Sequence, residues 1–386
     1  MNPLFAEARV SIFEHMSGLA REHEAVNLGQ GFPDFGWPDD VVASAAELLG
    51  SASNQYPPMR GLPELRAAVA AHYAAHQGID YALDEVIVTS GATEALASAI
   101  MALVSPGDEV VMFQPLYDAY VPLVRRAGGV PRFVTLTPPH WRITADALEQ
   151  AIGERTRLVI LNNPHNPTAR MFGRDELALL ADACVRHDVT LLSDEVWEHV
   201  AFDGRAHVPI AALPGMRERT VKVGSAGKIF SLTGWKVGWF CAPRSLGAPI
   251  TGVHQYVAFT TPPNLQGAVA YGLGKDMRYF DAMRAGFGAA RDRLVRGLRE
   301  AGYVPLEAEG SYFLCVDLAA SRIAMDDVQF CERAVREAGV ATIPLSAFYE
   351  AEPVRNVIRL CFAKGEQTIA DGLAGLRRAR AAIGGK

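Results

Sequence analysis

The sequence predicts an α/β protein: a large domain with a mostly parallel, doubly wound sheet, and a smaller α+β domain. From about residue 86, short apolar runs of strand length alternate with longer amphipathic runs of helix length, which is the pattern of βαβ units. After about residue 276 this alternation stops. The chain has 386 residues, 49% of them hydrophobic, which is long enough for more than one buried core.

The alternating part of the chain predicts strands separated by helices. Helical spacing is clear around Glu94–Val104 and around Asp175–His187. Because parallel strands need long crossover connections, helices in these places favour a parallel sheet. The expected strands are Val86–Ser90, Glu109–Phe113, Arg157–Asn162, Val189–Ser193, Val221–Gly224 and Val237–Cys241.

The C-terminal part predicts a different order of secondary structure. It begins with one long amphipathic helix over Asp276–Gly302 that ends at a glycine. Strands are expected at Ser311–Asp317 and Asn356–Phe362, and helices at Asp326–Ala338 and Glu366–Ala382. The expected domains are an N-terminal arm (1–30) that belongs with the smaller domain or with a partner subunit, a large domain (31–275) and a small domain (276–386).

Composition excludes several classes of protein. The formal charge of -6 and the pI near 6.0, with no basic block, argue against a nucleic-acid or membrane binder. The five cysteines are scattered without a C-x-x-C pair, so we expect reduced thiols and no metal site. The sequence shows neither a secretory signal pattern nor an apolar run of membrane-spanning length. We therefore expect a cytoplasmic protein.

Polar groups follow several of the predicted strands, where ligands bind in open α/β sheets. Gly91, Ala92 and Thr93 come directly after Val86–Ser90 and open a helix, so their backbone N–H groups suit a phosphate. An ordinary strand-to-helix turn explains the same residues. The segment GSAGK at 224–228 lacks the spacing of a P-loop, which disfavours nucleotide binding.

Lys228 lies after another predicted strand, among small and apolar neighbours that are unusual for a surface lysine. Desolvation and a second cation, Lys236, would lower its pKa, as an imine-forming lysine requires. Asp194 ends the strand Val189–Ser193, where a buried carboxylate needs a partner. That partner is either a cationic ring nitrogen or, equally well, an ordinary salt bridge or helix cap.

Two further residues complete the candidate site. Asn166, in the loop NNPHNPT, is placed to donate a hydrogen bond to a ligand oxygen, although asparagine and proline also form such loops for structural reasons. Arg359 is a charge inside the apolar run NVIRLCF. Its planar fork suits a substrate carboxylate, and an internal ion pair is the alternative.

The order of these features, from the helix start at Gly91 to Arg359, resembles the fold-type I pyridoxal-phosphate aminotransferases almost end to end. The resemblance is strongest to the branch of methionine aminotransferase and the kynurenine–oxoglutarate (glutamine K) transaminases. It is carried by the strings LGQGFPDF, NQYPPMRG, SGATEAL, NPHNPT, SDEV, SAGKIFSLTGWKVGW, EGSYF, IPLSAFY and IRLCFAK.

The resemblance implies a role for each candidate residue. Lys228 holds pyridoxal 5'-phosphate as a Schiff base and shuttles the proton, while Asp194 keeps the pyridine nitrogen protonated so that the ring is an electron sink. The phosphate is held by Gly91, Ala92, Thr93, Ser225 and Lys236. Tyr117 stacks on the ring, Asn166 and Trp197 face its oxygen, and Tyr56 reaches the phosphate of a second subunit in a homodimer. Arg359, Asn166 and Gly31 bind the substrate carboxylate.

Two residues depart from the family pattern. Trp197 stands where the family usually has a tyrosine that donates to the ring oxygen, and Ala169 replaces the glycine that usually follows NPT. Losing a charge-assisted hydrogen bond costs about 1.5–3 kcal/mol, or about one to two pH units in a pKa. Our hypothesis is that the Schiff base titrates higher than in relatives. An absorbance titration with an ordinary pKa would contradict it.

The resemblance implies an enzyme that moves the amino group of methionine or a large neutral or aromatic amino acid to a 2-oxo acid. A pyridoxal-phosphate C–S β-lyase, acting on cysteine conjugates or cystathionine, would use the same lysine and aspartate. A cofactor-binding regulator is the third reading, and it is disfavoured because the match begins near residue 3 and leaves no room for a DNA-binding module. Aromatic residues that could line the pocket, or equally form core, are Phe32, Trp37, Tyr117, Trp197, Tyr256 and Phe348.

Overall fold

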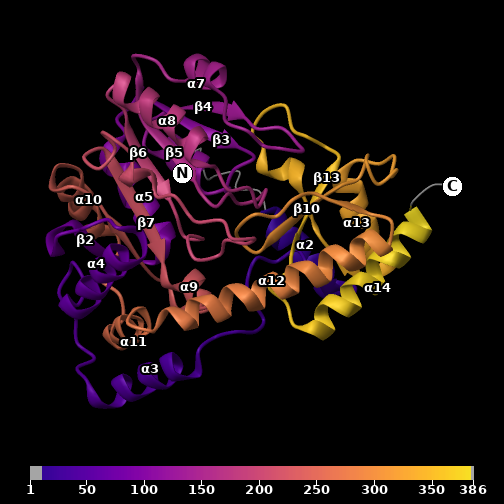
Figure 1. The fold of residues 1–386 in the computed structure, drawn as a ribbon, viewed down its shortest axis with the longest axis horizontal. Helices are drawn as coiled ribbons and strands as arrows, with labels where there is room; N and C mark the ends of the chain where they lie inside the picture. The colour runs from indigo at the N-terminus through magenta and orange to yellow at the C-terminus, as the bar shows by residue number, and fades with distance from the viewer. Residues whose placement is uncertain (1–10, 384–386) are drawn as a thin grey trace.

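The computed structural model describes residues 11–383, and its largest feature is a seven-stranded sheet in the order β2-β8-β7-β6-β5-β3-β4 (Figure 1). Strand β8 runs antiparallel to both of its neighbours, and every other pair is parallel. The strands are β2 (Val86–Ser90), β3 (Glu109–Gln114), β4 (Val130–Thr135), β5 (Thr156–Asn162), β6 (Thr190–Asp194), β7 (Thr220–Ser225) and β8 (Val237–Cys241).

Both faces of this sheet are covered, because alternate side chains of one strand enter different parts of the core. In β2, Ile87 packs in one hydrophobic cluster, whereas Val86 and Val88 pack in another. Phe240 and Trp239 of β8 divide in the same way. Burial on both faces is the doubly wound arrangement that the sequence predicts. The helices of this part are α3 (Asp39–Ser51), α4 (Pro63–Gln77), α5 (Gly91–Leu103), α6 (Tyr120–Arg126), α7 (Ala145–Ala151), α8 (Arg174–Arg186), α9 (Ala226–Ile229), α10 (Arg244–Val257) and α11 (Pro263–Leu273).

A second, four-stranded antiparallel sheet has the order β12-β13-β10-β9. Its strands are β9 (Val304–Pro305), β10 (Phe313–Asp317), β12 (Ile343–Pro344) and β13 (Val357–Cys361). Beside it lie α12 (Met277–Glu300), α13 (Asp327–Ala338) and α14 (Glu366–Ile383). In Figure 1 the long helix α12 runs from beside α9 and α11 to α14, so it connects the two parts of the molecule.

The start of the described chain lies with the C-terminal part. Helix α2 (Ile12–Glu22) packs on α13, and β1 (Val26–Asn27) pairs in parallel with β11 (Val340–Ala341). Residues 1–10 of the predicted arm lie outside the described residues. The division at 1–30, 31–275 and 276–386 stays a prediction.

The predicted strands of the large sheet agree with the structure to within one residue at each end. The helix with clear spacing around Glu94–Val104 begins at Gly91, as expected of the small residues that follow β2, and ends at Leu103. Strand β4 was not predicted. It lies at the sheet edge, contains Pro131 and exposes part of its length, so its sequence has no strong strand pattern.

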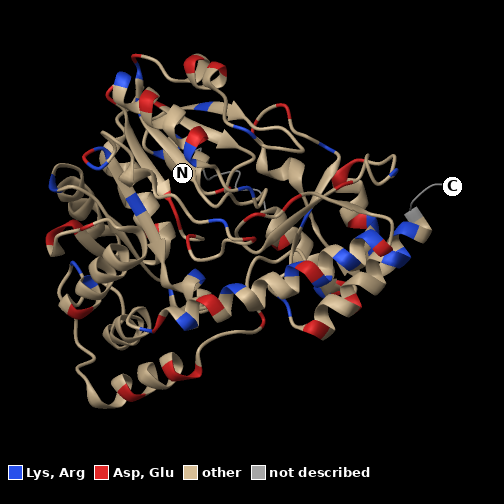
Figure 2. Cartoon of the chain, viewed as in Figure 1, with Lys and Arg blue, Asp and Glu red and all other residues tan. Residues whose placement is uncertain are grey.

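Acidic and basic side chains are interspersed along the outer helix α12, whereas on α14 the acidic residues precede the arginines (Figure 2). Ion pairs such as that of Arg293 with Glu366 join these two helices. In the described range 11–383, no helix is both long enough and apolar enough to span a bilayer.

Candidate active site

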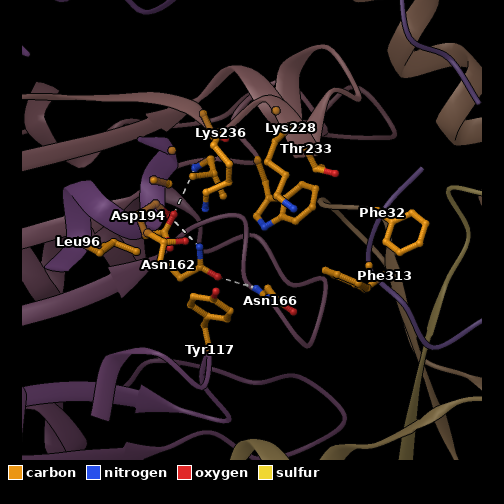
Figure 3. Close-up of a pocket in the computed structure, with 18 of the residues that line it drawn as sticks. Phe32, Leu96, Tyr117, Asn162, Asn166, Asp194, Lys228, Thr233, Lys236 and Phe313 are labelled. Carbon is orange, nitrogen blue, oxygen red and sulfur yellow. Dashed lines mark hydrogen bonds between the residues drawn. The ribbon is translucent and has the colours of Figure 1, made fainter. Parts of the chain in front are cut away.

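The polar groups predicted from the strand ends converge on one cavity of about 410 Å³ (Figure 3). Strands β2, β5, β6 and β7 end beside it, at Ser90, Asn162, Asp194 and Ser225. Because these strands are parallel, their carboxyl ends meet at one edge of the sheet. The lining includes Phe13, Gly31, Phe32, Gly91, Ala92, Thr93, Tyr117, Asn162, Asn166, Asp194, Trp197, Ser225, Lys228, Lys236, Phe313 and Arg359.

One end of the cavity is suited to an anion. Gly91 opens α5 with φ +71, and a Cβ there would lie 3.2 Å from the amine of Lys236. A Cβ on Gly238 would lie 2.6 Å from the carbonyl carbon of Gly91 and 2.7 Å from the nitrogen of Ala92. Glycines at these two positions therefore let β8 lie directly against the start of α5. The result is a helix N-terminus with free N–H groups and a lysine beside it.

Lys228 occupies the short helix α9, directly after β7. Burial lowers the pKa of its amine to about 8; Lys236 and Arg359 act in the same direction, while Cys361 and Asp194 oppose it. The amine donates to the hydroxyl oxygen of Tyr312 at 3.2 Å and lies 4.7 Å from the centre of the Trp197 ring. A lysine with this pKa is neutral for a substantial fraction of the time near pH 8, so it can act as a nucleophile.

Asp194 lies at the other end of the cavity, on β6, with its side chain buried. Tyr120 donates to its Oδ2 at 2.6 Å, and the Val196 N–H donates to its Oδ1 at 3.4 Å. Burial nevertheless raises the pKa of the carboxyl to about 6. No ion pair of Asp194 is found within residues 11–383, which excludes the ordinary salt bridge that the sequence left open.

A chain of hydrogen bonds joins the Asp194 end of the cavity to Arg359. The Asn162 amide donates to the backbone carbonyl of Asp194 at 2.9 Å, and its oxygen accepts from the Asn166 N–H at 2.7 Å. The Asn166 oxygen in turn accepts from the Arg359 guanidinium at 2.9 Å. Figure 3 shows Asn162 between Asp194 and Asn166. The distance between the two charged ends is thus set by bonded groups, which is the positioning that catalysis requires.

Arg359 is 1% exposed and lies on β13 of the second sheet. Its second nitrogen donates to the Gly29 carbonyl at 3.1 Å, and its Cζ lies 4.0 Å from the centre of the Phe313 ring and 4.8 Å from that of Phe348. Burial lowers its pKa to about 10, so it remains charged. In the described chain it makes no salt bridge, and each terminal nitrogen keeps one N–H free for an anion.

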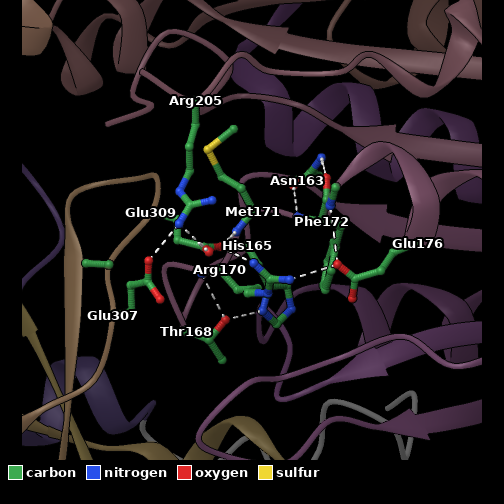
Figure 4. Close-up of polar contacts among 12 residues, drawn as sticks. Asn163, His165, Thr168, Arg170, Met171, Phe172, Glu176, Arg205, Glu307 and Glu309 are labelled. Atoms are coloured by element: carbon green, nitrogen blue, oxygen red, sulfur yellow. Dashed lines mark hydrogen bonds and ion pairs between the residues drawn. The ribbon is translucent and has the colours of Figure 1, made fainter. Parts of the chain in front are cut away.

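An ion-pair network stabilises the loop that carries Asn166 (Figure 4). Arg170 pairs with Glu309 and with Glu176, the latter at 2.8 Å. Glu309 also accepts from the Met171 N–H at 2.8 Å and pairs with Arg205 at 3.2 Å. Since Glu309 begins the segment EGSYF, this network joins the asparagine loop to the segment that carries Tyr312 and Phe313.

Most predicted site residues lie together, but not all. Tyr56 is 83% exposed and lies outside the cavity, against Phe259, so its predicted contact with a second subunit stays a prediction. Trp37 and Tyr256 are also exposed away from the cavity, and Phe348 packs beneath Arg359 rather than lining the pocket. The aromatic residues that do line it are Phe13, Phe32, Tyr117, Trp197 and Phe313.

No role was predicted from the sequence for Tyr120, Asn162 or Tyr312. Asn162 stands at a strand end inside the quoted loop, so its position was a signal that could have been used. Tyr312 belongs to the string EGSYF, which supported the family resemblance but did not indicate that the tyrosine contacts Lys228. Nothing in the sequence around Tyr120 distinguishes it from a core tyrosine of α6.

The fold and the cavity define an enzyme in which a lysine amine, a strand-end carboxylate and an anion-binding helix start surround one ligand. The chain belongs to the aminotransferase class I and II family, whose family model matches residues 23–375. It is 42% identical to the methionine aminotransferase of Escherichia coli K12, over 98% of this chain and 99% of that protein. It is 36% identical to human kynurenine–oxoglutarate transaminase 1, over 91% of each. The structure of N-succinyldiaminopimelate aminotransferase from Mycobacterium tuberculosis matches with a TM-score of 0.95 and 39% identity, over 98% of this chain and 100% of that one.

The cofactor of this family is pyridoxal 5'-phosphate, and the cavity fits it. The close approach of Gly238 to Gly91 forms a cradle that suits a phosphate. Asp194 is a buried carboxylate with a raised pKa and no cationic side chain bonded to it, as expected of a group that receives a ring cation. The amine of Lys228 lies in the same cavity.

Proposed function

We propose that the protein transfers the amino group of methionine, or of a large neutral or aromatic L-amino acid, to a 2-oxo acid. The observation that carries the proposal is Arg359, a buried guanidinium with free N–H groups and no carboxylate partner in the described chain. The Arg359 side chain lines the same cavity as Lys228. A buried charge without a partner is costly, so this arrangement is best explained by a substrate carboxylate.

We propose these roles for the residues that hold the cofactor. Gly91, Ala92, Thr93, Ser225 and Lys236 would bind its phosphate, and Asp194 its ring nitrogen. Tyr117, which lines the cavity together with Thr93, would stack on the ring, and Asn166 and Trp197 would lie beside its oxygen. The bound cofactor supplies an electron sink for the bonds at the substrate α-carbon.

Lys228 would hold the cofactor, and its Nζ, once free, would move the proton between the substrate α-carbon and the cofactor. An amine with a pKa of about 8 is suited to this work, because both of its protonation states are populated near neutral pH. Arg359, Asn166 and the Gly31 backbone would fix the substrate carboxylate while the proton moves. Tyr312 donates to the Gly31 carbonyl at 2.6 Å and so connects the lysine to this loop.

The side-chain part of the cavity supports a neutral substrate. Phe13, Phe32 and Phe313 line it, and apolar walls favour apolar side chains. The cations among the described lining residues are Lys228, Lys236 and Arg359, and each already has a proposed partner. A substrate with a second carboxylate would leave that group without a cation.

A donor panel tests the proposal. Methionine, phenylalanine, tyrosine, kynurenine, aspartate and an S-substituted cysteine are each supplied with several 2-oxo acids, and both the new amino acid and any released pyruvate and ammonia are measured. The expected result is amino transfer from methionine and the aromatic donors, with little from aspartate. If methionine and aromatic donors leave the cofactor absorbance unchanged, the substrate assignment fails. Release of pyruvate and ammonia instead of transfer would indicate the lyase.

The lysine assignment has its own test. Lys228→Ala should abolish turnover and the absorbance of covalently bound cofactor. Lys275, which forms an ion pair with Asp40, is the control, and Lys275→Ala should retain both. A Lys228→Ala variant that keeps either property would overturn the assignment.

We also infer a cytoplasmic homodimer. The exposed rings of Tyr56 and Tyr256, 83% and 86% exposed, support an interface with a second copy, and the five cysteines are free and buried. If Tyr56 reaches the partner's cofactor, Tyr56→Phe should weaken cofactor binding without changing the mass measured by light scattering. A monomeric mass would contradict the inference.

A further inference from the structure

A cluster of three histidines lies outside the cofactor cavity. His72 and His76 are one turn apart on α4, so their side chains project from the same face. His199 lies on the segment that follows β6, five residues after Asp194. One ring nitrogen of each histidine lies within 4.8 Å of the others.

The ring nitrogens of two of these histidines face each other directly. The Nε2 atoms of His72 and His199 form a hydrogen bond of 2.7 Å, which an ion between them would replace, and both side chains are almost fully buried. Two zinc–nitrogen bonds of about 2.0–2.1 Å at a tetrahedral angle separate the nitrogens by about 3.3 Å. A metal ion placed between them therefore needs the two rings to part by about 0.6 Å. His76 is only partly buried, so it can turn its ring toward the same point.

The residue type suits a transition metal, because a neutral imidazole binds such ions through a ring nitrogen. In the described part of the chain, none of the three rings hydrogen-bonds a carboxylate.

A neighbouring group provides an instructive contrast. Glu195, Glu198 and His207 also lie close together, but Lys222 already bonds to both carboxylates, with 2.7 Å to Glu198. His207 contacts Glu195 at 2.6 Å. This acidic group thus has its cation within the protein, whereas the histidine cluster has none.

The cluster is reached from a second cavity of about 840 Å³, lined by His76, His199 and Glu198 among others. This cavity is separate from the one that holds Lys228, since the two share no lining residue. It gives an ion a route to the rings and leaves room for a water molecule as the fourth ligand.

We propose that His72, His76 and His199 form a binding site for a divalent transition-metal ion of the zinc class. Imidazole nitrogens are good ligands for zinc, nickel and copper and poor ones for magnesium and calcium. A bound ion would tie α4 to the segment that carries Asp194 and Trp197. The expectation of no metal site rested on the scattered cysteines and did not weigh the spacing of His72 and His76.

Metal binding is tested on the cofactor-loaded protein without an affinity tag. Titration with zinc chloride by calorimetry should give one ion per chain, and cobalt substitution should give visible bands of tetrahedral Co²⁺ at wavelengths beyond the cofactor absorption. His76→Ala should abolish both signals. His140→Ala, the loss of an exposed histidine, should leave them unchanged. His76 is the least buried ligand, and circular dichroism will show that its variant is folded.

Three results would overturn the proposal. One is the absence of saturable binding of one zinc ion per chain. Another is binding of unchanged affinity in His76→Ala. The third is binding that survives in His76→Ala but disappears in His207→Gln, because it would place the ion on the acidic group.

Discussion

Replacing Asp194 by asparagine tests whether the charge of this buried carboxylate destabilises the protein when no cation is bound to it. Its side chain is 5% exposed, and burial raises its pKa from 3.8 to about 6 against the hydrogen bonds from Tyr120 and Val196. At about 1.4 kcal/mol per pH unit, this rise destabilises the charged, cofactor-free protein by about 3 kcal/mol. An asparagine carries no charge, can accept from the Val196 N–H and can donate to the Tyr120 oxygen. Without cofactor, Asp194→Asn should therefore be more stable than the wild type at neutral pH.

The effect has a defined dependence on pH. Because the native pKa lies above the unfolded value, the native wild type binds the proton more tightly, so its stability falls as the pH rises from about 4 to about 6 and is then level. All other titrating groups are common to both proteins. The free-energy difference between the two should therefore be small near pH 4 and about 3 kcal/mol in favour of the variant at pH 7.5.

Urea unfolding of both proteins without cofactor, at equal protein concentration, measures this difference. With cofactor bound, the order should reverse, since only the wild type offers a charge to the ring nitrogen. A difference that does not change with pH would refute the reasoning. So would a cofactor-free variant that is less stable than the wild type at pH 7.5.

Three further substitutions test the site and its support. Gly238→Ala should weaken cofactor binding at least about tenfold in a fluorescence titration, because its Cβ would lie 2.6 Å from the backbone at the start of α5. Gly234→Ala, which meets nothing within 4 Å, is the control, and equal affinities would contradict the prediction. Tyr312→Phe removes the hydroxyl that accepts from the charged Lys228 amine, so the pKa of this amine should fall. The rate at which Lys228 captures the cofactor covalently should then reach half its maximum at a lower pH. An unchanged pH profile would show that the Tyr312 hydroxyl does not stabilise the charged amine. Glu309→Gln should lower the free energy of unfolding by about 1–3 kcal/mol, because the Glu309 side chain is buried and forms two ion pairs. Glu307→Gln should lower it by less than about 0.5 kcal/mol, because the Glu307 side chain is exposed. Equal denaturant midpoints for these two variants would show that the network does not stabilise the loop.

The central strands could be predicted from the sequence because they are buried on both faces. β5 has all but one of its residues buried, so its apolar run is continuous and of strand length. β4 is the opposite case. Only Val134 of its six residues is buried, and it lies at a sheet edge. Its strand conformation therefore depends on pairing with β3, which the local sequence pattern does not indicate.

The same division holds within the candidate site. Asp194 and Gly91 stand at strand ends, and the carboxyl ends of parallel strands meet, so their proximity followed from the order of elements. Tyr120 and Tyr312 reach the site differently. Tyr120 bonds to a residue 74 positions away and Tyr312 to one 84 positions away, and each arrives from a helix or loop rather than from a strand end. Such contacts depend on how whole elements pack, which residue types alone do not determine.

Trp197 shows how the structure adds a cause that residue types could not supply. From the sequence, the lost tyrosine hydroxyl alone suggested that the lysine nitrogen bound to cofactor holds its proton more tightly than in relatives. In the structure, the Trp197 ring lies 4.7 Å from the Lys228 amine and edge-on to Tyr312 at 4.1 Å. A cation beside an aromatic ring is stabilised by about 0.5–2 kcal/mol. In the cofactor-free protein the ring therefore favours the protonated amine, while burial of the amine opposes it. The effect of the missing tyrosine hydroxyl on the lysine nitrogen bound to cofactor stays a prediction, which an absorbance titration tests.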